Sequence, residues 1–252
     1  MGLISDYKIK RYIEKNNSML PNSLIRDNID QWKNQYSSAE PFPHIVIDDF
    51  FSDVVLSKVE KEFVSKDKQK DWATFKHPNY EWRKNATTHD FMIPFFTRHL
   101  VYEMNSQPFI NFLEELTGIK CLLPDTTLEG GGLHSVLPQG QLEIHVDFNA
   151  HPKTKFQRRV NLLLYLNKNW KPEYGGNLEL WDSKMSRCEQ SIEPIFNRIV
   201  IFNSTDDSFH GHPHPLSCPD DRIRKSIAIY YYTQEAPTSS HSTLYQKRTT
   251  NR

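Results

Sequence analysis

The second half of the chain contains QLEIHVDF (141–148), RRVNLLLYLN (158–167), GGNLELWD (175–182), RIVIFN (198–203) and RKSIAIYYYT (224–233). Each run is short and rich in apolar residues, and clusters of Gly, Pro, Asn and Asp separate one run from the next. Roughly six to eight such strands over residues 120–233 are typical of a β-sandwich or a jelly roll.

Residues 1–119 show helical spacing instead. Apolar residues recur at three- and four-residue intervals from Asp53 to about Ser65, and Ser52 precedes them as a candidate N-cap. The same spacing predicts a helix over 107–117. The expected fold class is therefore mainly β (α+β), with N-terminal helices packed against one face of a β core.

We expect one domain over residues 1–252, in which 120–233 form the β core. Residues 72–91 are rich in aromatic and basic side chains and show no clear period, so we interpret them as an irregular active-site lid. Residues 234–252 are polar and predicted to be a loose tail.

The composition excludes several classes of protein. Lys plus Arg and Asp plus Glu are both 31, so there is no basic field for nucleic acid. No run approaches the ~18 apolar residues of a membrane span. The three cysteines form no CxxC pair, which predicts free thiols and a cytoplasmic protein.

A histidine and an aspartate stand two residues apart on the strand-like run 141–148. In an extended strand, His145 and Asp147 project to the same side, where an imidazole and a carboxylate can share one cation. An HxD pair alone is weak evidence, because a surface histidine and aspartate near a turn would look the same.

Three further histidines follow the run RIVIFN, within STDDSFHGHPHPL (204–216). We favour His210 as the third ligand, with His212 as its main rival, because His212 and His214 are each followed by proline. Two histidines and one carboxylate leave three positions open on a metal, as Fe(II) oxygenases require. A structural zinc site would normally close with four ligands, and the cluster contains no cysteine.

The run RKSIAIYYYT places Arg224 and Ser226 on one face of an otherwise apolar strand. A buried guanidinium is costly unless it meets an anion, and its fork can grip a carboxylate through two bonds. The alternative is an arginine exposed to solvent at the strand end.

Taken in order, HxD, YLN with a following lysine and tryptophan, GG, a distal histidine and R-x-S resemble the prolyl 4-hydroxylase branch of the 2-oxoglutarate/Fe(II) dioxygenases. The resemblance covers about residues 120–233, and PFPHIVIDDFF (41–51) is similar to the usual lead-in of bacterial and viral members. It implies a double-stranded β-helix (a jelly roll) with supporting helices.

The resemblance also implies roles for individual residues. The iron ligands would be His145, Asp147 and His210, and the far carboxylate of 2-oxoglutarate would be bound by Arg224, Ser226 and Tyr165. Because the segment between His210 and Arg224 is longer than in similar enzymes, Arg222 is a competitor for that carboxylate. Where hypoxia-type enzymes carry a tyrosine near the co-substrate, this chain has LHSVLPQG (133–140), so either His134 or Ser135 takes that place or no residue does.

The implied cofactors are Fe(II), 2-oxoglutarate and O2, with ascorbate considered as an accessory reductant. The implied reaction hydroxylates an aliphatic C–H and releases succinate and CO2. A prolyl residue in a peptide or protein is the leading substrate, and a free amino acid, a sugar or another small metabolite is the alternative. A non-catalytic cupin-like binding module is a third possibility, since it could share the jelly roll.

Overall fold

The computed structural model describes residues 2–77 and 79–246. Its five α-helices all precede residue 118 and are α1 Gly2–Asn16, α2 Asn22–Ser38, α3 Asp53–Glu62, α4 Phe95–Met104 and α5 Gln107–Thr117. Short 3-10 helices are η1 Lys66–Lys68, η2 Asp90–Met92 and η3 Pro172–Tyr174. The strands are β1 His44–Ile47, β2 Ala73–His77, β3 Glu81–Ala86, β4 Leu123–Pro124, β5 Gly132–Val146, β6 Gln157–Tyr165, β7 Leu178–Trp181, β8 Cys188–Ile192, β9 Ile199–Asn203, β10 His210–His212, β11 Arg224–Thr233 and β12 Leu244–Tyr245.

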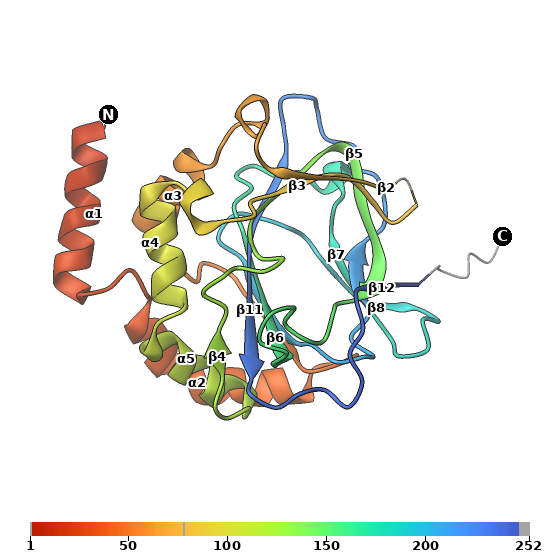
Figure 1. The fold of residues 1–252 in the computed structure, drawn as a ribbon. Helices are drawn as coiled ribbons and strands as arrows, with labels where there is room; N and C mark the ends of the chain where they lie inside the picture. The colour runs from red at the N-terminus through yellow and green to blue at the C-terminus, as the bar shows by residue number, and fades with distance from the viewer. Residues whose placement is uncertain (1, 78, 247–252) are drawn as a thin grey trace.

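The strands form one curled, antiparallel sheet, which agrees with the double-stranded β-helix (jelly roll) that the family resemblance implied. Its main path is β1-β9-β6-β11-β5-β10-β7-β8. The 15-residue strand β5 joins the two halves, since its first part pairs with β11 and its last part pairs with β10. In Figure 1 the helices lie together on one side of this curled sheet.

Alternation along β6 shows how the sheet separates the core from the site. Leu162 and Leu164 pack in the large apolar cluster beneath the helices, together with side chains of α2, α3 and α5. The intervening Asn161 and Leu163 line a cavity on the concave side. Because strand side chains alternate between faces, the same strand supports the helices and furnishes the site.

The predicted helices are largely confirmed. The helix over 107–117 has the expected bounds, and Gly118 adopts the left-handed conformation (φ 74°) that commonly ends a helix. The other helix ends at Glu62 rather than near Ser65, and its N-cap residue Ser52 makes no side-chain capping bond.

The prediction that residues 72–91 are irregular was wrong. They contain the antiparallel hairpin β2–β3, and β3 also pairs with β5. Aromatic and basic residues do not alternate regularly along either strand. β3 is paired on both sides, and its ladders with β2 and β5 each contain a register shift that interrupts the alternation of faces. Periodicity alone could not reveal a strand of this kind.

The prediction of a loose tail was wrong for the part of 234–252 that the structure describes. Leu244 and Tyr245 pair with Val146 and His145, and the backbone N–H of Gln246 donates to the carbonyl of Ile144 (2.8 Å). The Asn149 side chain holds this segment upstream, through bonds to the backbone at Ser239 and His241. Residues 247–252 lie outside the described residues.

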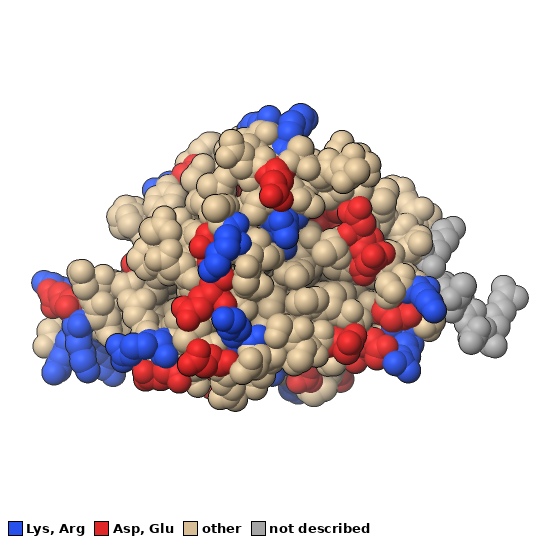
Figure 2. Space-filling model, turned by 90° about the horizontal axis from the view of Figure 1, so that it is seen from below, with Lys and Arg blue, Asp and Glu red and all other residues tan. Residues whose placement is uncertain are grey.

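The surface agrees with the balanced charge of the sequence. On the face shown in Figure 2, basic and acidic side chains are interspersed. The cysteines Cys121, Cys188 and Cys218 are free, as predicted. Within the described ranges, no helix has both the length and the apolar character needed to cross a membrane.

Candidate functional site

One cluster of potential metal ligands lies where β5 and β10 meet. His145, Asp147 and His210 present ligand atoms that all lie within 4.8 Å of one another, the only such cluster of three or more found in the described part of the chain. His145 and His210 are direct partners across the two strands, and their ring centroids are 4.5 Å apart. His145 and Asp147 project to the same side of β5, and the pairing of β5 with β10 brings His210 beside them.

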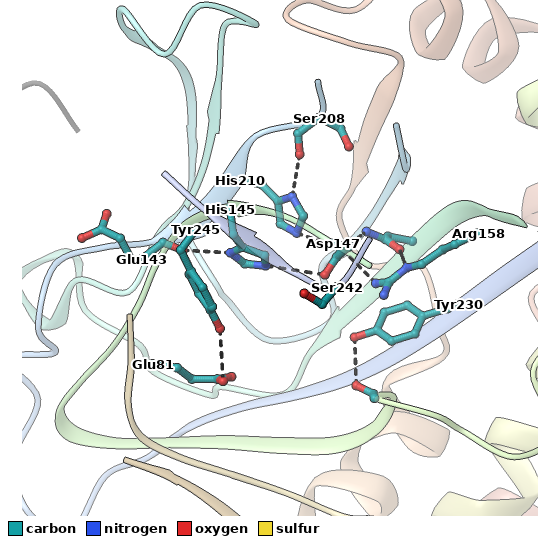
Figure 3. A network of polar contacts seen from close by, with 12 residues as sticks. Glu81, Glu143, His145, Asp147, Arg158, Ser208, His210, Tyr230, Ser242 and Tyr245 are labelled. Carbon is teal, nitrogen blue, oxygen red and sulfur yellow. Dashed lines mark hydrogen bonds and ion pairs between the residues drawn. The ribbon is translucent and has the colours of Figure 1, made fainter. Parts of the chain in front are cut away.

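Hydrogen bonds fix the orientation of both imidazoles (Figure 3). The Nδ1 atom of His145 lies 2.8 Å from the carbonyl oxygen of Glu143, and the Nδ1 atom of His210 lies 2.8 Å from that of Ser208. A carbonyl oxygen can only accept, so each Nδ1 carries a proton. In the neutral rings both Nε2 atoms therefore present a lone pair, as metal ligands do.

Two donors hold the carboxylate of Asp147. Its Oδ2 atom accepts from Arg158 Nη2 (2.9 Å) and from Asn161 Nδ2 (2.7 Å), while Arg158 Nε donates to Asn161 Oδ1 (2.7 Å). The guanidinium stacks on Tyr230, 3.4 Å from the ring centroid, and lies 4.6 Å from that of Phe148. With Oδ2 occupied by these donors, Oδ1 is the oxygen available to a cation.

The electrostatics suit cation binding. Burial alone would raise the pKa of Asp147, but the Arg158 guanidinium, followed by His210, outweighs burial and holds that pKa well below its usual range. Burial, followed by the nearby His210, lowers the pKa of His145. The site thus presents an ionised carboxylate and a neutral imidazole, the protonation states that a metal requires. Two imidazoles and a carboxylate fit Fe(II) and leave positions open for other ligands.

A second polar group lies at the other end of the same cavity. Arg224 is 5% exposed; its Nε donates to the carbonyl of Gly176 (2.7 Å) and its Nη2 donates to the hydroxyl of Tyr165 (3.2 Å). Ser226, two residues further along β11, lines the cavity beside it. Burial lowers the pKa of Arg224, and an anion is the partner that would offset the cost of burying its charge.

The structure also separates the alternatives left open by the sequence. Arg224 lines the cavity, whereas Arg222 is exposed. His134 lines the cavity, whereas Ser135 projects to the other face and donates to Gln69. His212 lines the cavity as well but does not belong to the ligand cluster.

Among the polar lining residues, Arg158, Asn161 and Tyr230 were not anticipated as functional, whereas Lys84 was expected only as part of the lid over 72–91. Lys84 reaches the cavity from β3 and bonds Glu81 (2.7 Å). Arg158, like Arg224, stands at the start of an apolar strand, but strict alternation would place Arg159 rather than Arg158 on the face of Asn161.

Comparison with known proteins agrees with this geometry. Residues 131–232 match the model of the 2OG-Fe(II) oxygenase superfamily, and this range contains all three clustered ligands as well as Arg224. A prolyl 3-hydroxylase of Mus musculus, OGFOD1, is 32% identical over 79 residues, which are 30% of this chain and 14% of that protein. The match therefore spans a small part of that relative.

Solved structures share the fold at low identity. A prolyl hydroxylase from Trichoplax adhaerens, in complex with a hypoxia inducible factor peptide fragment, has a TM-score of 0.61 at 16% identity, covering 84% of this chain and 93% of that one. A prolyl-4-hydroxylase from Pseudomonas putida has a TM-score of 0.58 at 15% identity, covering 82% and 99%. Since residues 131–232 match the family model and bring the two histidines and the aspartate together inside this jelly roll, this segment belongs to the 2OG-Fe(II) oxygenase superfamily.

Proposed function

We propose that this oxygenase hydroxylates an aliphatic C–H of a prolyl residue in a peptide or protein and releases succinate and CO2. The observation that carries the proposal is a single cavity with the ligand cluster at one end and Arg224 at the other. Such a cavity can hold a dicarboxylic keto acid between a metal and a guanidinium.

At the metal end, His145 and His210 would bind Fe(II) through Nε2, and Asp147 would bind it through Oδ1. When bound, iron and 2-oxoglutarate supply the oxidising chemistry that activates O2. Arg158 and Asn161 hold the carboxylate so that one oxygen is directed to the metal. Restraint of this kind by neighbouring residues commonly sustains metal affinity.

At the far end, Arg224 would bind the distal carboxylate of 2-oxoglutarate. Tyr165 orients the guanidinium through its hydroxyl, and the Ser226 hydroxyl lies on the same face of β11. These residues are all at most 5% exposed, so they keep water away from the bound acid. Exclusion of water strengthens each of these charged contacts.

A peptide substrate is supported by two observations. The Nη1 atom of Arg158 is buried without a hydrogen-bond partner in the described residues, and an amide carbonyl at the metal end would satisfy it. The partial relative from Mus musculus is named a prolyl 3-hydroxylase.

The test is 2-oxoglutarate turnover by the iron-loaded protein, with proline-containing peptides, free amino acids and sugars as substrates. His145→Ala and His210→Ala should abolish succinate formation, and His214→Ala, at an exposed position outside the cluster, should not. Hydroxylation of a free amino acid or a sugar, with no peptide accepted, would refute the peptide assignment. Absence of succinate under every condition would favour a binding module.

A further inference from the structure

His212 is a buried histidine that the site described so far does not use. It is 4% exposed and lines the cavity from β10, two residues beyond the ligand His210. Its Nδ1 is buried with no hydrogen-bond partner in the described chain, and no residue described there bonds its Nε2 either.

Burying an imidazole nitrogen without a hydrogen-bond partner costs free energy of folding. A buried polar group without a partner loses about 1–3 kcal/mol relative to one that is paired, so most such groups in folded proteins have a partner. The backbone beside His212 is closely packed, because its neighbour Gly211 lies against β5, with the Glu143 carbonyl 2.8 Å from where a Cβ would be. A ligand in the cavity is therefore the partner that His212 can gain.

The surroundings of His212 indicate an anion. The charged groups that act on it most strongly are Arg224 and then Lys84, both of which line the same cavity. The one carboxylate among the lining residues is that of Asp147, which belongs to the metal end. Lys84 is paired with Glu81 (2.7 Å), whereas the hydrogen-bond partners of Arg224 in the described chain are the Gly176 carbonyl and the Tyr165 hydroxyl, so Arg224 is the cation left to be balanced by an anion.

We propose that His212 is a further co-substrate contact, whose ring N–H donates to the distal carboxylate of 2-oxoglutarate beside Arg224. This inference rests on the proposed function and extends it by one residue. It also gives the histidine that competed with His210 for the metal a separate role, since both residues line the cavity from β10 but only His210 belongs to the ligand cluster.

The experiment measures equilibrium binding of 2-oxoglutarate to protein loaded with Mn(II), by calorimetry, so that no turnover is needed. His212→Leu should weaken binding by about 10- to 100-fold, the effect of losing a hydrogen bond to a charged group. His212→Gln keeps an N–H donor and should recover part of the loss. His44→Leu is the matched control, because His44 is also buried on a strand but does not line the cavity.

A second acid locates the contact. 2-Oxopentanoate has the same number of carbons but a methyl group in place of the distal carboxylate, so its affinity should be nearly the same for His212→Leu and the original protein. An equal loss for both acids, an unchanged affinity for 2-oxoglutarate, or a loss of Mn(II) binding itself would each overturn the assignment. If the original Mn(II)-loaded protein does not bind 2-oxoglutarate at all, the proposed function fails instead.

Discussion

Replacing Arg158 with methionine should strongly destabilise the metal-free protein. Arg158 is 1% exposed and forms an ion pair with Asp147, whose side chain is 12% exposed. Methionine preserves the length and most of the apolar contact of the side chain but removes the charge and the hydrogen bonds that Arg158 donates to Asp147 and Asn161. The carboxylate then keeps its bond from Asn161 and its contacts with the Nε2 atoms of His145 (3.5 Å) and His210 (3.3 Å).

The expected loss of stability follows from the chemistry of the Asp147 carboxylate once Arg158 no longer pairs with it. Removing one partner of a buried ion pair costs about 3–5 kcal/mol. The cost has a ceiling, because Asp147 can take up a proton instead of remaining charged. Protonating an acid of ordinary pKa near 3.9 at neutral pH costs about 1.4 kcal/mol for each of roughly three pH units, or about 4 kcal/mol. We therefore expect a loss of about 3–4 kcal/mol in the free energy of unfolding.

Urea unfolding with a chelator present measures this loss. Arg159→Met is the matched control, since Arg159 is the adjacent residue but its side chain is 30% exposed and pairs with the exposed Glu235 at 3.7 Å. Its loss should stay within about 1 kcal/mol. The pKa of Asp147 is depressed in the folded protein, so the stability it contributes is present above about pH 4 and is lost as the pH falls through the folded pKa. The difference between Arg158→Met and the original protein should accordingly shrink below about pH 4.

Two results would refute this reasoning. One is a loss in Arg158→Met no larger than that in Arg159→Met. The other is simple additivity with Asp147→Asn, because removing the charge of Asp147 should make the later loss of Arg158 less costly.

Further predictions concern the co-substrate, pH and the hairpin. Arg224→Lys should weaken 2-oxoglutarate binding by about 1–3 kcal/mol in calorimetry, whereas Arg222→Ala should leave it unchanged. Burial, and then Lys84, lowers the pKa of His134 well below 6.5, so as the pH falls the unfolded chain binds a proton at His134 before the folded protein does. The free energy of unfolding should therefore fall as the pH drops below about 6.5, by up to about 1.4 kcal/mol per pH unit. His134→Leu should reduce that slope. If the β2–β3 hairpin closes over the substrate, Trp82→Ala should lower substrate hydroxylation and spare substrate-free succinate formation, whereas joint loss with a lower melting temperature would indicate packing alone.

The parts of the fold that could be predicted were those with a regular period. The helix over 107–117 and the alternating strand at 141–148 follow from local spacing. The sequence could predict that a later histidine joins His145 and Asp147. It could not predict that His210 pairs directly with His145, because strand pairing depends on contacts between residues far apart in the sequence.

Arg158 escaped prediction because β6 contains a bulge. Strict alternation would place Arg159, rather than Arg158, on the same face as Asn161. In the structure Tyr231 pairs with Val160 while Tyr232 pairs with Arg158, so Arg159 is the extra residue and the phase changes there. A bulge of this kind re-aims one side chain without leaving a signal in the composition.

The pairing of β12 with β5 has a consequence for where this protein can be truncated. The segment matched by the family model ends at residue 232, but the strand that carries His145 has Tyr245 on its outer side. A fragment ending with the matched segment would retain every clustered ligand and leave the backbone groups of residues 144–146 without their outer partners. Exposed strand edges recruit other chains, so such a fragment would be prone to aggregation although its site residues were intact. The boundary of the family is therefore not the boundary of the stable unit, which extends at least to Gln246.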